Sequence, residues 1–163
     1  MKKDDLFNYV KLFQNTIIKC KDKLSVEFQS FPCGSCGTTC LLLGTFLAEN
    51  GFVNLKMKIG EKNDSNGQEY SHAWLETDNS FIIDITAYQF PEITEKILFG
   101  KKPSWYDEWI VTEEIEDVNL FVTSDVITTD FVNYEILMGN IYSLDKGLEQ
   151  RRSRPPQANE LCE

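Results

Sequence analysis

The sequence predicts one α+β domain in which helices near the N-terminus pack on an antiparallel β-sheet. Three observations favour this fold class. Apolar residues recur at helical spacing in residues 4–21, residues 35–50 are apolar on most faces, and three segments of strand character follow between residues 52 and 90. The chain has 163 residues, of which 42% are hydrophobic, so one domain can bury a substantial core. We assign residues 1–150 to this domain.

Residues 4–21 are expected to form an amphipathic helix that follows two acidic residues. Its apolar face consists of Leu6, Val10, Phe13 and Ile17. Cys20, near the end of this helix, is expected to be a small buried or boundary residue. The sequence Phe-Pro-Cys-Gly at residues 31–34 breaks regular structure, so a loop should precede Ser35.

The segment "SCGTTCLLLGTFLAEN" predicts a buried helix that begins at Ser35 or Cys36 and ends at Asn50. Gly51 follows as a good C-terminal cap. Cys40 lies in the apolar part of this segment and is expected to belong to the core.

Three strands are expected next, in "FVNLKMKIG" (52–60), "EYSHAWLET" (69–77) and "FIIDITAYQF" (81–90). Their order suggests an antiparallel meander. If the turn "DNS" is a three-residue loop, Trp74 opposes Asp84 and His72 opposes Thr86, so His72 and Asp84 lie diagonally on one face. A two-residue loop would place them on opposite faces unless a bulge intervened.

The last third of the chain gives weaker signals. Residues 91–99, "PEITEKILF", suggest a helix opened by Pro91. Residues 104–115 are aromatic and acidic, and residues 121–144 mix strand and helix character. The tail 151–163, "RRSRPPQANELCE", has too few apolar residues to join a core. Four aromatic residues are expected in the core, with a substrate groove as the alternative: Trp74, Trp105, Tyr106 and Trp109.

Charge and composition exclude several classes of partner. The net charge of −10 would repel phosphate backbones and anionic lipid surfaces, so we expect neither a nucleic acid nor a membrane partner. No apolar run is long enough to span a membrane, and Asp4 and Asp5 stand where a signal peptide would be apolar. A cytoplasmic location is therefore expected. The odd count of five cysteines then indicates free thiols.

Three residues form a candidate catalytic constellation. A thiol in the first turn of a helix is stabilised as thiolate by the helix dipole, and a nearby imidazolium stabilises it further, which suits Cys36. The only histidine in the sequence is His72. Asp84 stands among isoleucines, where burial without a partner would cost several kcal/mol, so it needs a donor. His72 fits that need, and Asp84 would fix its tautomer.

The same residues resemble a known superfamily. "GSCG" opening a helix, "HAWLE" on a strand and "IIDIT" on the next resemble the Cys-His-Asp order of transglutaminase-like, papain-fold cysteine enzymes. These include bacterial peptidases that remove leader peptides, arylamine acetyltransferases and transglutaminases. The resemblance runs from about Phe31 to Phe90.

This resemblance implies roles for individual residues. Cys36 would be the nucleophile, His72 the base and Asp84 the orienting acid, with no cofactor. A glutamine before the cysteine would donate to the oxyanion; Gln29 is the near candidate, and the backbone N–H of Cys36 is the alternative. The substrate would be a peptide, a protein or a small amide, and the acyl acceptor would be water or an amine.

Three other interpretations stay open. Cys33-Gly-Ser-Cys36 before a helix is typical of thiol-disulfide oxidoreductases. The thioredoxin arrangement normally brings a cis-proline on a later strand against the cysteine pair, and no proline occurs between Cys33 and Phe90. Cys33, Cys36, Cys40 and His72 could form a zinc site, against our expectation of no metal. A non-catalytic binding module with the same fold is the third.

Overall fold

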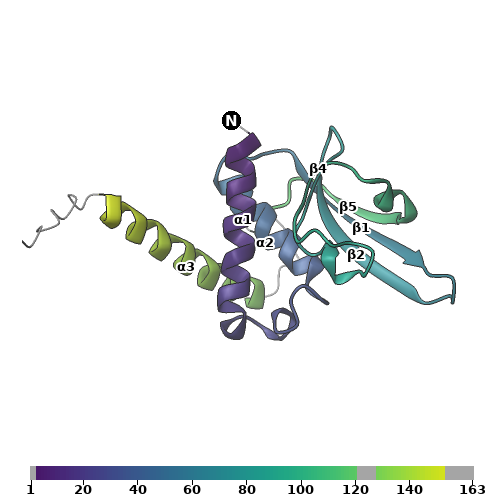
Figure 1. The fold of residues 1–163 in the computed structure, drawn as a ribbon, viewed down its shortest axis with the longest axis horizontal. Coiled ribbons are helices and arrows are strands. Elements are labelled where there is room, and N and C mark those ends of the chain that lie inside the picture. The colour runs from purple at the N-terminus through teal and green to yellow at the C-terminus, as the bar shows by residue number, and fades with distance from the viewer. Residues whose placement is uncertain (1–2, 121–127, 153–163) are drawn as a thin grey trace, which may run out of the picture.

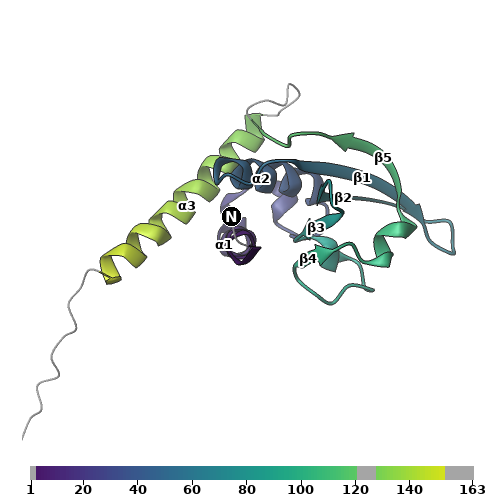
Figure 2. The ribbon, with the colours of Figure 1, turned by 90° about the horizontal axis from the view of Figure 1, so that it is seen from above.

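The computed structural model describes residues 3–120 and 128–152 and shows an α+β fold. Three helices, α1 (Lys3–Cys20), α2 (Cys36–Glu49) and α3 (Thr128–Arg152), lie beside one five-stranded antiparallel sheet. Helix α2 lies between α1 and the sheet, and the C-terminal half of α3 projects away from the other elements (Figures 1 and 2). None of the helices among the described residues is long and apolar enough to cross a membrane.

The sheet is a meander with one returning strand. Its strands are β1 (Leu55–Asn63), β2 (Glu69–Thr77), β3 (Phe81–Asp84), β4 (Leu98–Lys101) and β5 (Ile110–Ile115). Their order is β4-β3-β2-β1-β5, and each neighbouring pair is antiparallel. Four short 3₁₀ helices join these elements: η1 (Lys21–Lys23), η2 (Val26–Phe28), η3 (Ala87–Gln89) and η4 (Ser104–Glu108).

The main core lies between the helices and one face of the sheet. Phe13 and Ile17 of α1 and Leu43 of α2 are almost completely buried there, together with Leu75 and Ile83 of the sheet. Helices α1 and α2 form because each buries an apolar face in this core. The sequence predicted the bounds of both helices to within a residue or two. Cys20 and Cys40 are also buried in it, as expected.

A second, aromatic core covers the opposite face of the sheet. Its buried members are Trp74, Ile82, Ala87, Phe90, Trp105, Tyr106 and Trp109. The four aromatic residues expected in the core, with a groove as the alternative, are buried core residues, and the three tryptophans among them make ring contacts with His72.

Two sequence predictions are wrong in this region. The strand expected over 81–90 ends at Asp84, because the Oδ1 atom of Asp84 accepts hydrogen bonds from the backbone N–H groups of Thr86 and Ala87 and turns the chain into η3. The helix expected over 91–99 is absent, since Leu98 pairs with Asp84 in β4 and the carbonyl of Lys96 accepts from Gln14 of α1. Long-range pairing overrides the local helix signal there.

The C-terminal third of the chain gave only weak sequence signals. Residues 104–115 form η4 and β5. Of residues 121–144, positions 121–127 lie outside the described residues and the rest belong to α3. Arg151 and Arg152 of the expected loose tail continue α3, and positions 153–163 lie outside the described residues.

Candidate functional site

The candidate site lies where β3 leaves the sheet. Strand β2 pairs with β3 only at Leu75–Ile83 and Glu76–Ile82, and the chain turns away after Asp84. The edge of β2 beside Ala73 is therefore open to the N-terminus of α2. The backbone N–H of Ala73 donates a hydrogen bond to the sulfur of Cys36, the first residue of that helix.

The register of the β2–β3 hairpin brings His72 and Asp84 together. Residues 78–80 form a three-residue loop, and Ser80 adopts the positive φ of 55° that such loops require. The register pairs Leu75–Ile83 and Glu76–Ile82 agree with the three-residue alternative, which puts His72 and Asp84 on one face. The Nε2 atom of His72 lies 2.6 Å from the Oδ2 atom of Asp84. The two side chains are 0% and 1% exposed.

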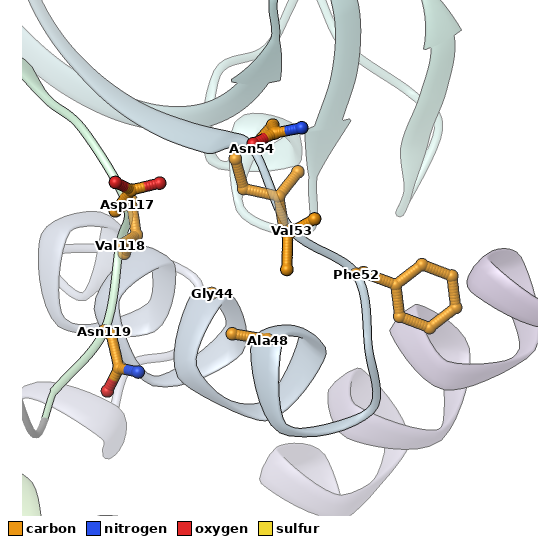
Figure 3. A pocket seen from close by; sticks show the side chains of 9 residues that line it. Gly44, Ala48, Phe52, Val53, Asn54, Asp117, Val118 and Asn119 are labelled. Atoms are coloured by element: carbon orange, nitrogen blue, oxygen red, sulfur yellow. The ribbon is translucent and has the colours of Figure 1, made fainter.

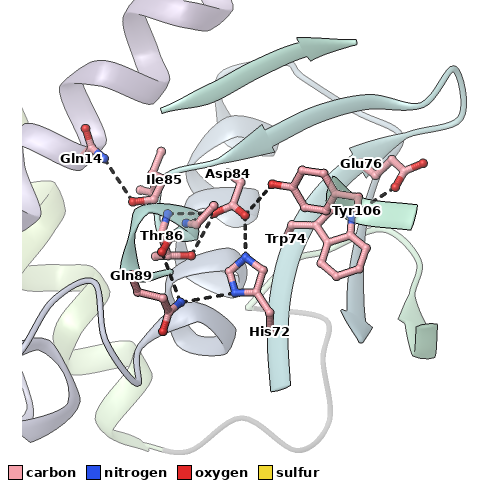
Figure 4. Close-up of polar contacts among 10 residues, drawn as sticks. Gln14, His72, Trp74, Glu76, Asp84, Ile85, Thr86, Gln89 and Tyr106 are labelled. Atoms are coloured by element: carbon pink, nitrogen blue, oxygen red, sulfur yellow. Dashed lines mark hydrogen bonds and ion pairs between the residues drawn. The ribbon is translucent and has the colours of Figure 1, made fainter. Parts of the chain in front are cut away.

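Asp84 accepts hydrogen bonds on both carboxylate oxygens (Figure 4). Its Oδ1 atom accepts from the N–H of Thr86 at 2.8 Å, the hydroxyl of Thr86 at 2.9 Å and the N–H of Ala87 at 3.0 Å. Its Oδ2 atom accepts from the hydroxyl of Tyr106 at 2.8 Å and faces His72. These contacts satisfy a buried carboxylate and fix its orientation.

Electrostatics in the pair favour a protonated imidazole and an ionised carboxylate. Burial would lower the pKa of His72, but the charge of Asp84 and their hydrogen bond, with a smaller contribution from Cys36, raise that pKa to about 9. Burial would likewise raise the pKa of Asp84, but the charge and hydrogen bond of His72 and the donors around the carboxylate hold it below its usual value. His72 therefore carries a positive charge at neutral pH.

The same charge acts on Cys36. Burial opposes ionisation of this half-buried thiol, but the hydrogen bond and charge of His72 and the N–H groups of Ala73 and Gly37 bring its pKa below the usual value. Burial instead raises the pKa of Cys20 and Cys40, and Cys33 is exposed. Among the cysteines within the described ranges, Cys36 is thus the one whose surroundings favour the thiolate.

The structure does not bring Gln29 into this constellation. Its side-chain nitrogen donates to the carbonyl of Lys21 at 2.9 Å and to that of Leu24 at 3.2 Å, so it fastens the end of η1. The glutamine at the site is Gln89, whose side-chain nitrogen lies 3.4 Å from the Nδ1 atom of His72. Gln89 and Thr86 were missed because the sequence placed them on a continuous strand.

Aromatic rings enclose His72 on its remaining sides. The ring centroids of Phe90, Trp109 and Trp105 lie 5.2, 5.5 and 5.9 Å from that of His72. The ammonium of Lys62 lies 4.9 Å from the centroids of both tryptophan rings and covers this cluster. The cluster excludes water from the imidazole, which strengthens its interaction with Asp84.

Two cavities lie near α2 and the aromatic cluster. One, of about 300 Å³, is at the end of α2 remote from Cys36; Figure 3 shows that Gly44, Ala48 and Val118 line it. The other, of about 500 Å³, includes Phe90 of the cluster around His72, and its charged lining residues are Lys62, Asp64, Glu92 and Glu108.

Other interpretations of the cysteines find less support in the geometry. Over residues 3–120 and 128–152, no group of three or more His, Cys, Asp or Glu side chains is arranged to hold a metal ion. Cys33 and Cys36 are both free thiols, one exposed and one half-buried. No family model, curated protein or solved structure matches the chain.

Proposed function

We propose that this protein is a cysteine-dependent acyl-transfer enzyme that acts on an amide or peptide bond through Cys36, His72 and Asp84. The observation that carries the proposal is the buried pair of His72 and Asp84, joined at 2.6 Å beside a helix-terminal thiol whose pKa is lowered. A charged pair buried on the sheet is costly for stability, so its presence beside a nucleophile favours a catalytic role.

The reaction begins from the thiolate–imidazolium pair of Cys36 and His72. Because Nε2 of His72 faces Asp84, Nδ1 is the nitrogen that holds the proton given up by the Cys36 thiol. The thiolate attacks the carbonyl carbon, and the electron pair of the C=O bond moves to oxygen. The backbone N–H of Cys36 is the oxyanion donor we retain from the sequence analysis.

Collapse of the tetrahedral intermediate completes acylation. The C–N bond breaks, the leaving amine takes the proton from Nδ1 of His72, and a thioester forms on Cys36. Water or an amine then attacks the thioester while His72 accepts its proton and returns it to the sulfur. Water gives a peptidase, amidase or deamidase, whereas an amine gives a transglutaminase or an acetyltransferase.

Charge favours neutral or cationic acyl donors over anionic ones. The protein carries a net charge of −10, and the groove that includes Phe90 has three carboxylates against one lysine. We therefore propose peptides, proteins or small amides without a net negative charge as substrates.

The experiment that tests the proposal measures the alkylation rate of each cysteine by iodoacetamide against pH, by mass spectrometry. We expect Cys36 to react fast below pH 7 and to lose that advantage in His72→Ala. The wild-type protein should also release a burst of nitrophenol from p-nitrophenyl acetate and carry the acetyl group on Cys36.

Ser71→Ala is the matched control, since Ser71 neighbours His72 on β2 and has an exposed side chain. It should leave both readouts unchanged. A Cys36 that titrates like a free thiol near pH 8.5 and ignores His72 would overturn the proposal and leave a binding module.

A further inference from the structure

Gln89 makes two contacts through one nitrogen. Its side-chain N–H₂ group donates to the carbonyl of Thr86 at 3.2 Å and lies 3.4 Å from Nδ1 of His72. The carbonyl of Thr86 fixes which amide atom is which, because the amide oxygen in that place would face another oxygen. In Figure 4 the amide oxygen points away from the imidazole.

The second N–H of Gln89 therefore faces the reacting nitrogen of His72. An N–H donor stabilises the lone pair of a neutral imidazole and disfavours a proton at the same nitrogen. Asp84 acts in the opposite sense from Nε2, where it stabilises the imidazolium. Nδ1 of His72, the ring nitrogen that does not face Asp84, thus has the amide donor of Gln89 at 3.4 Å.

The element that carries Gln89 lies beside the loop of the nucleophile. Tyr88, its neighbour in η3, makes a ring contact with Phe31, the rings' centroids being 6.4 Å apart. Gln89 is only half-buried, whereas His72 is completely buried. Its amide is therefore a partly solvent-accessible polar group beside the buried imidazole.

Other charged and titratable groups also face the His72–Asp84 pair. Cys36 and Cys40 approach from α2, Tyr106 from η4, and the ammonium of Lys62 lies behind the tryptophan rings. A negative charge on Cys36 favours the imidazolium form of His72, whereas the positive charge of Lys62 disfavours it. Of these groups Cys36 hydrogen-bonds His72 and titrates itself, whereas the amide of Gln89 is a neutral donor at every pH.

We propose that Gln89 is a positioning residue whose N–H disfavours a proton on Nδ1 of His72 and thereby limits how strongly the thiolate–imidazolium pair is populated. This role rests on the proposed function, because it sets how readily His72 takes the proton of Cys36 and returns it to the leaving group. A general acid works best when its proton is not held too tightly.

The test uses the fact that His72 is the only histidine in the sequence. With ¹⁵N-labelled histidine, NMR follows both ring nitrogens of His72 through a pH titration without ambiguity. We expect Gln89→Met, which keeps the length of the side chain but removes the donor, to raise the pKa of His72 by about half a pH unit. Gln89→Asn, whose amide is too short to reach, should shift it in the same direction.

Activity gives a second readout that a merely structural defect would not imitate. Stabilising the imidazolium lowers the pKa of Cys36 and raises that of His72, so the pH window of acylation by p-nitrophenyl acetate should widen at both limbs in Gln89→Met. Gln68→Met is the matched control, because Gln68 is exposed and its side-chain nitrogen donates to the neighbouring carbonyl of Glu69. It should change neither the titration nor the window.

The same titration in Cys36→Ala separates this inference from the proposed function. The shift caused by Gln89→Met should persist there, since it needs neither the thiol nor catalysis. An unchanged or lowered pKa of His72 in both backgrounds would overturn the role of Gln89, whatever the reactivity of Cys36. A slow, His72-independent Cys36 in the wild type would overturn the proposed function instead.

Discussion

Nε2 of His72 lies 2.6 Å from Oδ2 of Asp84, and neither side chain is more than 1% exposed. The distance is typical of a strong hydrogen bond between charged groups. It assigns one ring nitrogen to the carboxylate and leaves the other for the thiol of Cys36.

Asp84→Asn should reverse which ring nitrogen of His72 carries the proton of the neutral imidazole. Oδ1 must still accept from Thr86 and Ala87, so the new N–H₂ group would face His72 and donate to Nε2. The proton of a neutral imidazole would then sit on Nδ1, which could no longer accept the proton of Cys36. We expect kcat/KM for acylation to fall by roughly 100- to 10,000-fold.

NMR checks the Asp84→Asn prediction beside the acylation rate. The ring ¹⁵N signals of His72 should show the proton moved from Nε2 to Nδ1 at high pH. Asp78→Asn is the control, since Asp78 is exposed in the adjacent turn. Full activity in Asp84→Asn would show that Asp84 has a structural role only.

Tyr106→Phe removes one donor from the buried carboxylate of Asp84. The hydroxyl of Tyr106 donates to Oδ2 at 2.8 Å, and its burial and the nearby carboxylate raise its pKa, so it stays protonated. We expect the free energy of unfolding in urea to fall by about 1–3 kcal/mol and acylation to slow less than in Asp84→Asn. Tyr70→Phe, at an exposed hydroxyl, should leave stability nearly unchanged. Equal stability of the two variants would contradict this prediction.

The raised pKa of His72 predicts a pH-dependent stability. A group whose pKa is higher in the folded state stabilises the fold below its unfolded pKa, and loses that contribution as the pH rises through the folded value. In Cys36→Ala, which removes the titrating thiol and its share of the shift, the free energy of unfolding should therefore fall between about pH 6.5 and 9, by up to roughly 3 kcal/mol. Urea unfolding at several pH values measures this.

The comparison for this prediction is the double variant Cys36→Ala, His72→Gln. It should lack the fall over the same pH range, because no imidazole remains to lose its proton. If both proteins show the same profile, another group causes the dependence and the pair of His72 and Asp84 is not charged.

The sequence could predict the meeting of His72 and Asp84 because it depends on local rules. Two strands and a three-residue loop fix the register, and alternation then puts both side chains on one face. The same alternation failed after Asp84. On a continuous strand Gln89 would lie on the face opposite to Asp84, but the side chain of Asp84 turns the chain, and the turn brings Gln89 to His72.

Two other failures have the same origin in tertiary contacts. Gln29 is close in sequence to Cys36, but its amide is used by carbonyls at the end of η1. The helix signal of residues 91–99 depends on Pro91 and local spacing, whereas pairing with β3 determines the structure of Leu98. A single sequence contains no direct sign of either tertiary contact.

Gly44 is required by close packing between α2 and residue 118. A Cβ atom at Gly44 would lie 2.6 Å from Cγ1 of Val118 and 2.9 Å from its Cβ atom. Gly44→Ala should therefore lower the free energy of unfolding by about 1–3 kcal/mol, although alanine favours helices. Gly139→Ala in α3 meets nothing within 4 Å and should raise it by up to about 1 kcal/mol. A gain in stability in Gly44→Ala would contradict the close packing.

Cys33 and Cys36 should differ in their importance, although both belong to the same C-x-x-C sequence. The contacts that lower the pKa of Cys36 come from His72, Ala73 and Gly37, whereas the side chain of Cys33 is exposed. We expect Cys33→Ala to keep acylation by p-nitrophenyl acetate within about twofold of the wild type, and Cys36→Ala to abolish it. Circular dichroism of both variants checks that the fold is retained. Equal loss of activity in the two variants would favour a dithiol mechanism, because a thiol-disulfide oxidoreductase needs both sulfur atoms whereas acyl transfer needs one.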